Sequence, residues 1–360
     1  MKRLSTILAA AALAAPIAGC LDEDELTGEE IKSEDGKADA SELGVFMNAS
    51  FEGKLLTDSS WDDKQTVSDQ LLYTVGQLNG FTAVGRVDKA EVTNITKTTV
   101  NGKTQISYKA TLPIIWNKRN GVPTTVDLKL PLDISYAGQE AFATKYKHDC
   151  VDFGAHDVDA GSMFYYFRPR NSGCNLAAGD VHAVTAKLTP SPSQTTGKFP
   201  EYNKIWEDNT LNVVAIFGKY EDGATTAADA GIDGYNEFVG AMKTEFANRN
   251  LTTVPASVPS NPGVANPDIE FNATLPDGKK IKVVALLTDN VNKGLSEPTF
   301  RARYESLSTK ADFITYNGHA GLGSNIRALA SAGKWVAGQY VVVFMNGCDT
   351  FAYIDGSLFA

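Results

Sequence analysis

Hydrophobic and polar positions alternate along much of the first half of the chain, between residues 45 and 188. The alternation is clearest in two series: Ile106, Tyr108, Ala110 and Leu112, then Val126, Leu128, Leu130, Leu132 and Ile134. A period of two buries one face of a strand and leaves the other in water. Asn101-Gly102 separates two short strand-like segments and suits a tight hairpin turn with positive φ at both central residues. The pattern predicts an all-β, sandwich-like domain over residues 45–189.

The pattern changes at residues 190–204, a linker that opens with Pro190-Ser191-Pro192 and breaks every period. Beyond it, short continuous apolar runs alternate with segments of helical spacing. We expect strands at 211–217, 282–288, 311–316 and 340–344, and helices near 232–246, 298–307 and 326–330. Buried strands without alternation, separated by helices, predict an α/β domain over residues 205–360, with a mostly parallel sheet covered on both faces.

The start of the chain has the features of an export signal. A positively charged beginning precedes an apolar run of 11 residues, 7–17, which is too short to span a membrane as a helix. The run closes with Ile17-Ala18-Gly19-Cys20, which resembles the lipobox of bacterial lipoproteins. The resemblance implies that residues 1–19 are removed and that Cys20 becomes an acylated, membrane-anchored N-terminus. The alternative is an ordinary secretory signal in which the cysteine falls by chance. Leu21 after the cysteine, rather than Asp, implies sorting to the outer membrane of a bacterial cell envelope.

Residues 20–44 form an acidic segment. Between Leu21 and Glu42, ten acidic residues against Lys32 and Lys37 leave a net charge of −8. A segment with this charge and few apolar residues cannot bury a core, so we expect a disordered tether. A calcium loop is disfavoured, because the acids lack the alternating spacing and the glycine at the sixth position that such a loop needs.

The amino-acid composition and net charge limit the kinds of molecule that the protein can bind. The 360 residues are 43% hydrophobic and 21% charged, as in ordinary globular proteins. The net charge is −10 and the isoelectric point is near 5.0, so the chain offers no general basic surface for phosphates. We therefore expect no nucleic-acid partner.

Two of the four cysteines, Cys150 and Cys174, lie 24 residues apart in the expected β-domain. In an exported protein this pair predicts a disulfide. A zinc site is the alternative, because the segment also holds possible ligands: His148, Asp149, Cys150, Asp152, His156, Asp157 and Asp159. The disulfide is favoured, and we expect no metal and no other cofactor. The aromatic run at 163–167 between the cysteines favours a strand.

Candidate chemistry appears where the last two expected strands end. His319 follows the strand at 311–316, and Cys348 follows the strand at 340–344. Consecutive strands are often neighbours, and ligands bind beyond the carboxyl ends of such strands. A thiol needs a base to become a nucleophile, and imidazole is the usual base. The alternative is a buried structural thiol beside a hydrogen-bonded loop histidine.

The motifs Tyr316-Asn317-Gly318-His319 and Asn346-Gly347-Cys348 resemble clan CD cysteine peptidases, the caspase and gingipain-like group. The resemblance implies a caspase-like fold in which Cys348 is the nucleophile and His319 is the general base and acid. It also implies that the backbone N–H groups of Cys348 and Ala320 form an oxyanion hole. The family builds further strands after the cysteine, whereas 12 residues follow Cys348 here. The resemblance therefore leaves three alternatives: an inactive relic, a pocket completed by a partner, or a domain incomplete at its C-terminus.

The sequence therefore predicts an exported, lipid-anchored cysteine peptidase that acts on polypeptides. Its partners would be a polypeptide substrate and, through the lipid anchor, a membrane. The alternative is a catalytically inactive surface lipoprotein whose C-terminal domain binds a partner. A metal-binding function of the segment from His148 to Asp159 is a third and weaker reading.

Overall fold

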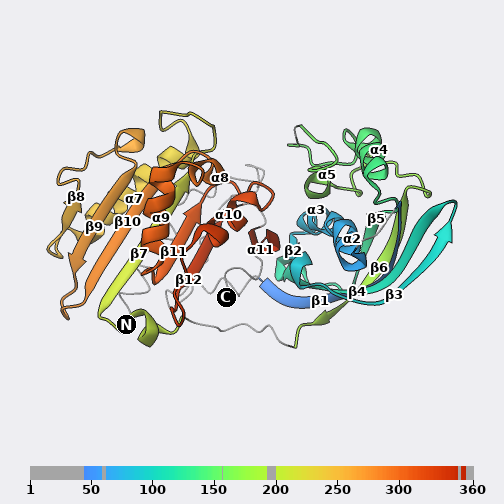
Figure 1. Ribbon diagram of the computed structural model, residues 1–360, viewed down its shortest axis with the longest axis horizontal. Coiled ribbons are helices and arrows are strands. Elements are labelled where there is room, and N and C mark those ends of the chain that lie inside the picture. Colours follow the sequence, from blue (N-terminus) through green and yellow to red (C-terminus); the bar gives the residue numbers. More distant parts are fainter. Residues whose placement is uncertain (1–43, 59–61, 156, 193–199, 348–349, 354–360) are drawn as a thin grey trace. The chain divides into compact units, whose positions relative to one another are not determined.

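The computed structural model describes residues 44–58, 62–155, 157–192, 200–347 and 350–353. The chain divides into two compact units, which meet in sequence near Lys198 and Phe199. The N-terminal unit contains the elements between residues 44 and 192, and the C-terminal unit contains those between 200 and 347 (Figure 1). A short helix, α11 (Thr350–Tyr353), ends the described part of the chain.

The N-terminal unit is built on one antiparallel sheet. Its strands are β1 (Gly44–Thr57), β2 (Ala83–Gly85), β3 (Glu91–Val100), β4 (Lys103–Asn117), β5 (Thr125–Pro131) and β6 (Val181–Pro190). They pair in the order β2-β4-β1-β6-β5, and β3 also pairs with β4. The unit also contains the helices α2 (Asp63–Leu71), α3 (Tyr73–Asn79), α4 (Tyr136–Tyr146) and α5 (Met163–Tyr166), and the 3-10 turns η3 (Val87–Lys89) and η4 (Lys118–Asn120).

The predicted β-sandwich is wrong, because a sandwich needs two facing sheets and the described residues of this unit form one curled sheet (Figure 1). Met47, Ala49 and Leu55 of β1 are buried at alternate positions, as the period-two pattern requires. The helices α2 and α3 supply the opposing apolar surface, with Val67 and Leu78 fully buried. The sheet therefore buries one face against helices.

Two glutamine side chains join these helices to the sheet. Gln70 of α2 donates hydrogen bonds from Nε2 to the carbonyl oxygens of Lys54 and Pro131, at 3.0 and 2.6 Å. Gln77 of α3 donates to the Lys129 carbonyl at 2.9 Å and accepts from the Lys129 N–H at 2.8 Å. The Gln77 amide thus pairs with edge strand β5 as another strand would, which satisfies backbone groups that would otherwise be buried without partners.

Several local predictions for this unit can be compared with the structure. Asn101 and Gly102 form the turn between β3 and β4 with φ angles of 51° and 80°, so the predicted hairpin is confirmed. The predicted disulfide is also confirmed, with the Cα atoms of Cys150 and Cys174 4.6 Å apart. The aromatic run at 163–167 is not a strand, because it forms α5 and packs Met163 into a cluster around the disulfide.

The C-terminal unit is built on a mixed sheet. Its strands are β7 (Thr210–Gly218), β8 (Thr252–Val254), β9 (Asp268–Thr274), β10 (Lys280–Thr288), β11 (Phe313–Asn317) and β12 (Val342–Asn346). Its helices are α6 (Tyr202–Ile205), α7 (Ala230–Phe246), α8 (Val291–Gly294), α9 (Pro298–Ser308) and α10 (Ser324–Ala332), with a 3-10 turn η5 (Gly263–Ala265). The strand order is β12-β11-β7-β10-β9-β8.

The prediction of a mostly parallel, caspase-like sheet is wrong. β12, β11, β7 and β10 pair in parallel, but β9 pairs antiparallel with β10, and β8 pairs antiparallel with β9. The physical reason is a hairpin, because the chain turns at Pro276-Asp277-Gly278, where Gly278 has a φ of 87°. β8 and β9 lie between the helix expected near 232–246 and the strand expected at 282–288, where the sequence pattern predicted no strand.

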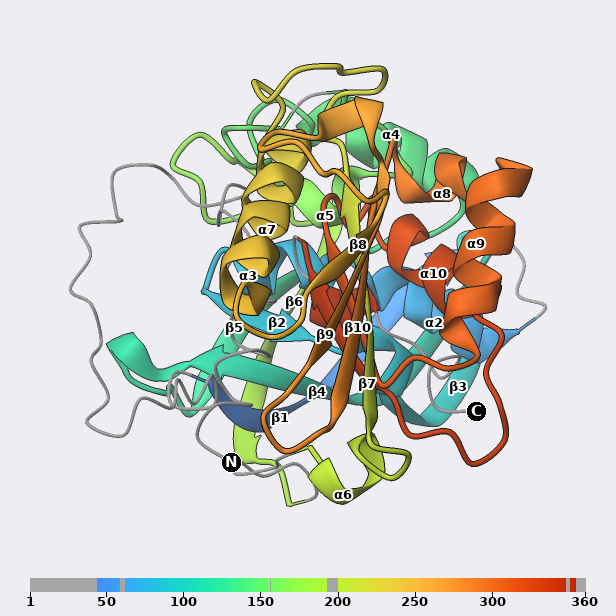
Figure 2. The same cartoon turned by 90° about the vertical axis from the view of Figure 1, so that its left-hand side faces the viewer.

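Helices cover both faces of this sheet. Figure 2 shows the strands edge-on, with α7 on one face and α8, α9 and α10 on the other. The α7 face contains an apolar core, in which Tyr235, Phe238 and Phe246 are fully buried against the odd-numbered residues of β7 and β10. No helix among the described residues has both the length and the hydrophobicity needed to cross a membrane.

Candidate active site

The carboxyl ends of β11 and β12 lie side by side at one end of the mixed sheet. The two strands pair in parallel, with Asn317 opposite Asn346. The side chain of Asn346 donates a hydrogen bond to Asn317 Oδ1 at 2.7 Å, and the N–H of Gly318 donates to the Asn346 carbonyl at 3.1 Å. The predicted adjacency of these two strands is confirmed, and the turns that follow them begin at the same point.

His319 follows β11 and has an exposed side chain on a fixed backbone. Its carbonyl oxygen accepts hydrogen bonds from Tyr316 Oη and Asn325 Nδ2, each at 2.7 Å. Both donors are fully buried, and burial raises the pKa of Tyr316, so its hydroxyl remains a donor at neutral pH. His319 is the only histidine between residues 199 and 360, so it supplies the only imidazole available to this unit from its own sequence.

Tyr220 contacts the imidazole of His319. The two ring centroids lie 4.4 Å apart with an interplanar angle of 53°. Tyr220 comes from the turn after β7, the strand next to β11. Sequence reasoning missed Tyr220 and Asn325 because chain order does not show that β7 lies beside β11. The available signal was the position of Tyr220 in the sequence, three residues after the apolar run that ends at Phe217.

The loop after His319 is rich in glycine and presents a backbone donor. Its positive φ angles fall on Gly321, Leu322 and Gly323, at 58°, 51° and 88°. Ala320 is buried and is not one of the described residues with positive φ, so its side chain is accommodated without backbone strain. Within the part of the chain that the structure describes, the Ala320 N–H donates no hydrogen bond.

Gly347, the residue before Cys348, packs against the His319 loop. A Cβ atom placed on Gly347 would lie 2.6 Å from the Gly318 carbonyl oxygen and 3.2 Å from the Ala320 nitrogen. Only glycine allows so close an approach without a shift of the backbone. Cys348 itself, with its predicted oxyanion N–H, lies outside the described residues. The structure thus brings together His319, Ala320 and Gly347.

The charged groups at this end of the sheet neutralise one another. Lys219 Nζ lies 2.8 Å from Asp289 Oδ1, and Lys293 Nζ lies 3.5 Å from Asp289 and 3.6 Å from Asp222. The hydrogen bond from Lys219 lowers the pKa of Asp289 below its ordinary value. Each lysine is paired with a carboxylate of the chain.

The N-terminus of α7 points to the same end of the sheet but is already occupied. Asp229 Oδ1 accepts from the N–H groups of Gly231 and Ile232 at 2.9 and 3.0 Å. Asp229 Oδ2 accepts from the N–H groups of Tyr220 and Glu221 at 2.9 and 2.7 Å. A carboxylate of the chain therefore fills the place where a phosphate could bind a helix N-terminus.

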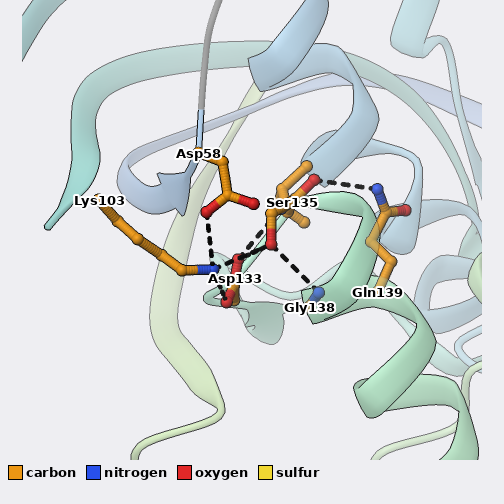
Figure 3. Close-up of polar contacts among 7 residues, drawn as sticks. Asp58, Lys103, Asp133, Ser135, Gly138 and Gln139 are labelled. Atoms are coloured by element: carbon orange, nitrogen blue, oxygen red, sulfur yellow. Dashed lines mark hydrogen bonds and ion pairs between the residues drawn. The ribbon is translucent and has the colours of Figure 1, made fainter.

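A serine and a lysine also meet in the N-terminal unit (Figure 3). Lys103 Nζ lies 3.0 Å from Ser135 Oγ and 2.6 Å from Asp133 Oδ2, and Asp58 is also within ion-pair distance. The hydrogen bond with Asp133 raises the pKa of Lys103, which therefore stays protonated. Ser135 is 4% exposed and caps α4 by accepting from the Gly138 N–H at 3.1 Å. This network joins the β3-β4 hairpin to α4 and is not arranged as a nucleophile and base.

Some of the remaining predicted site residues are described by the structure, and others are not. Cys150 belongs to the disulfide and so is not a thiolate ligand. The described residues contain no group of three or more His, Cys, Asp or Glu side chains that could hold a metal ion. His156 and Cys20 lie outside the described residues, as do the predicted signal at 1–19 and nearly all of the acidic tether.

The chain was compared with protein families, curated proteins and solved structures. No protein-family model, curated protein or solved structure matches the chain.

Proposed function

We propose that the protein is an exported, lipid-anchored cysteine peptidase in which Cys348 and His319 form a nucleophile and base pair. The observation that carries the proposal is the packing of Gly347 against the backbone of Gly318 and Ala320. Cys348 follows Gly347 directly in the sequence, and Gly347 lies beside the loop that carries His319. The neighbouring ends of β11 and β12 support this pair of residues without a caspase-like sheet.

The proposed reaction begins with proton transfer from the Cys348 thiol to the His319 imidazole. The sulfur attacks the carbonyl carbon of a peptide bond, and the carbonyl oxygen becomes an oxyanion. Collapse of this intermediate breaks the C–N bond, and His319 returns its proton to the leaving amine. Water then hydrolyses the thioester, which releases the acid and restores the thiol.

The Ala320 N–H is the described group best suited to stabilise the oxyanion. It lies beside Gly347, and it donates no hydrogen bond within the described residues. A donor that is fixed before the reaction stabilises the developing charge without reorganisation, which is typically worth several kcal/mol in acyl transfer. The second proposed donor is the Cys348 N–H.

The substrate we propose is a polypeptide, which the enzyme would cleave while anchored to a membrane through Cys20. The lipobox-like Ile17-Ala18-Gly19-Cys20 supports the anchor, and the acidic residues that follow support a tether to the folded units. The confirmed disulfide between Cys150 and Cys174 supports an oxidising compartment, as in a bacterial envelope. The exposed side chain of His319 is compatible with a large substrate.

Peptide hydrolysis by the full chain tests this proposal. The wild type, Cys348→Ala and His319→Ala would be incubated with a mixture of unstructured peptides, and new termini would be identified by mass spectrometry. We expect cleavage by the wild type and its loss in both variants, while His182→Ala in the N-terminal unit leaves it unchanged. Equal cleavage by the wild type and Cys348→Ala would refute the proposal. Absence of cleavage in the wild type would favour the inactive, partner-binding alternative.

A further inference from the structure

We propose that Tyr220 is a positioning residue that holds the imidazole of His319 in its working orientation. This inference rests on the proposed function of His319 as the base. Tyr220 has no equivalent in the motifs by which the sequence pointed to a site. Its role follows from the ring contact and from the way its own backbone is held.

The side chain of His319 needs an external constraint. Tyr316 and Asn325 fix the carbonyl oxygen of His319, but they do not contact its ring through the hydrogen bonds described above. The side chain is exposed, so rotation about its two side-chain torsions is not prevented by burial. Among the described residues, Tyr220 is the aromatic side chain in ring contact with the imidazole.

Tyr220 is itself fixed through Asp229. The Tyr220 N–H donates to Asp229 Oδ2 at 2.9 Å, and the other oxygen of this carboxylate caps α7. The first turn of α7 also packs closely on the end of β7, because a Cβ on Gly231 would lie 2.1 Å from the Gly218 carbonyl oxygen. The backbone of Tyr220 is therefore tied to a long, buried helix and not to a loose loop.

The contact can act in both charge states of the base. Burial and the negative charge of Asp229 raise the pKa of Tyr220, so the ring remains a neutral phenol at neutral pH. A neutral aromatic face packs against imidazole and also attracts imidazolium. Tyr220 can thus hold the imidazole of His319 both before and after the imidazole takes the proton from Cys348. The ring would then keep the same orientation when it accepts this proton and when it returns the proton to the leaving amine.

The test compares Tyr220→Leu with Tyr220→Phe in the full chain. The rate of Cys348 acylation by a peptidyl electrophile would be measured by mass spectrometry over a range of electrophile concentrations, which separates the maximal acylation rate constant from the half-saturating concentration. We expect Tyr220→Leu to lower the maximal rate constant by about 3- to 10-fold with little change in the half-saturating concentration, because the variant removes the aromatic contact with the imidazole and leaves the other groups of the site in place. Tyr220→Phe keeps the ring and should restore the rate. Tyr202→Leu, which removes another partly exposed tyrosine of the same unit, serves as the control.

A second set of variants separates positioning from a general effect on the fold. In a His319→Ala background, Tyr220→Leu should cause no additional loss, because the residue through which it acts is gone. The same loss in both backgrounds, or no loss in the wild-type background, would overturn the inference. If His319→Ala itself left the acylation rate unchanged, the proposed function would fail, and the positioning role of Tyr220 would fail with it.

Discussion

Asp312, one residue before β11, accepts two hydrogen bonds from Asn212 of the neighbouring strand β7. Its Oδ2 atom lies 2.7 Å from the Asn212 backbone nitrogen and 3.2 Å from Asn212 Nδ2. Burial nevertheless raises the pKa of Asp312 from 3.8 to about 6, and the negative charges of Asp208 and Glu207 add to the increase. The two hydrogen bonds from Asn212 only partly oppose this shift.

The raised pKa of Asp312 predicts that the C-terminal unit loses stability between about pH 4 and about pH 6. In this interval the folded chain holds a proton that the unfolded chain has released, so the free energy of unfolding falls as the pH rises. The loss is complete above the folded-state pKa. Since the group is partly exposed, we expect a contribution of about 1 kcal/mol.

Urea unfolding of Asp312→Asn at several pH values checks this prediction. The variant keeps an acceptor for Asn212 and removes the charge, so it should be more stable than the wild type near neutral pH. The difference should shrink toward about pH 4. Asp127→Asn, at an exposed position of β5, serves as a control for loss of a surface carboxylate. A constant difference between Asp312→Asn and the wild type across the whole range would contradict the expectation.

The side-chain contact between Asn346 and Asn317 should stabilise the paired ends of β11 and β12. Asn346→Ala removes the 2.7 Å hydrogen bond and leaves the buried Asn317 amide with an unsatisfied oxygen. We expect a loss of about 1–3 kcal/mol in the free energy of unfolding and slower modification of Cys348. Asn175→Ala, at a residue that bonds only within its own turn, should cause neither change. If Asn346→Ala had the same free energy of unfolding as the wild type, the hydrogen bond between Asn346 and Asn317 would not stabilise the strand ends.

The disulfide should be a major source of stability for the N-terminal unit. Cys150 and Cys174 close a loop of 24 residues beside an aromatic cluster that includes Tyr73, Phe142 and Phe167. Replacing both cysteines with serine should lower the free energy of unfolding by about 3 kcal/mol. Urea unfolding of the unreduced protein, with alkylation to count thiols, measures this loss. Full alkylation of both cysteines in unreduced wild type would mean that the disulfide does not form.

Lipidation at Cys20 is tested in an intact bacterial host. The wild type should incorporate a labelled fatty acid and partition into the detergent phase, because several acyl chains anchor a protein stably. Cys20→Ala should lose the label and either remain unprocessed or appear in the soluble fraction. Cys348→Ala, which leaves both the lipobox-like motif and the disulfide intact, controls for the loss of a cysteine residue elsewhere in the chain. Equal labelling and membrane association of the wild type and Cys20→Ala would exclude the anchor.

The sequence was most informative where a local pattern decides the structure. The Asn101-Gly102 hairpin could be predicted because few other residues adopt its positive φ angles. The strands β7, β10, β11 and β12 could be predicted because each is a continuous apolar run. The dipeptide Asp277-Gly278 is an equally local turn signal, and the turn there makes β9 antiparallel to β10. The prediction of a mostly parallel sheet lacked this hairpin.

Other features depend on contacts that no local pattern contains. Helix α2 buries Gln70, whose amide finds its partners at Lys54 and Pro131, far away in sequence. A buried polar residue weakens the helical hydrophobic pattern until its tertiary partners are known. The same reason hid Tyr220, because its proximity to His319 follows from the order of the strands and not from their sequence.

The central claim is that His319 activates Cys348, and the rate of thiol alkylation tests it most directly. Iodoacetamide would be reacted with the full chain near neutral pH, and modification of Cys348 would be followed by peptide mass spectrometry, with glutathione as the model thiol. We predict that Cys348 reacts at least about tenfold faster than glutathione, that His319→Ala removes this advantage, and that His182→Ala does not. Reaction of Cys348 no faster than glutathione, or an unchanged rate in His319→Ala, would contradict the account.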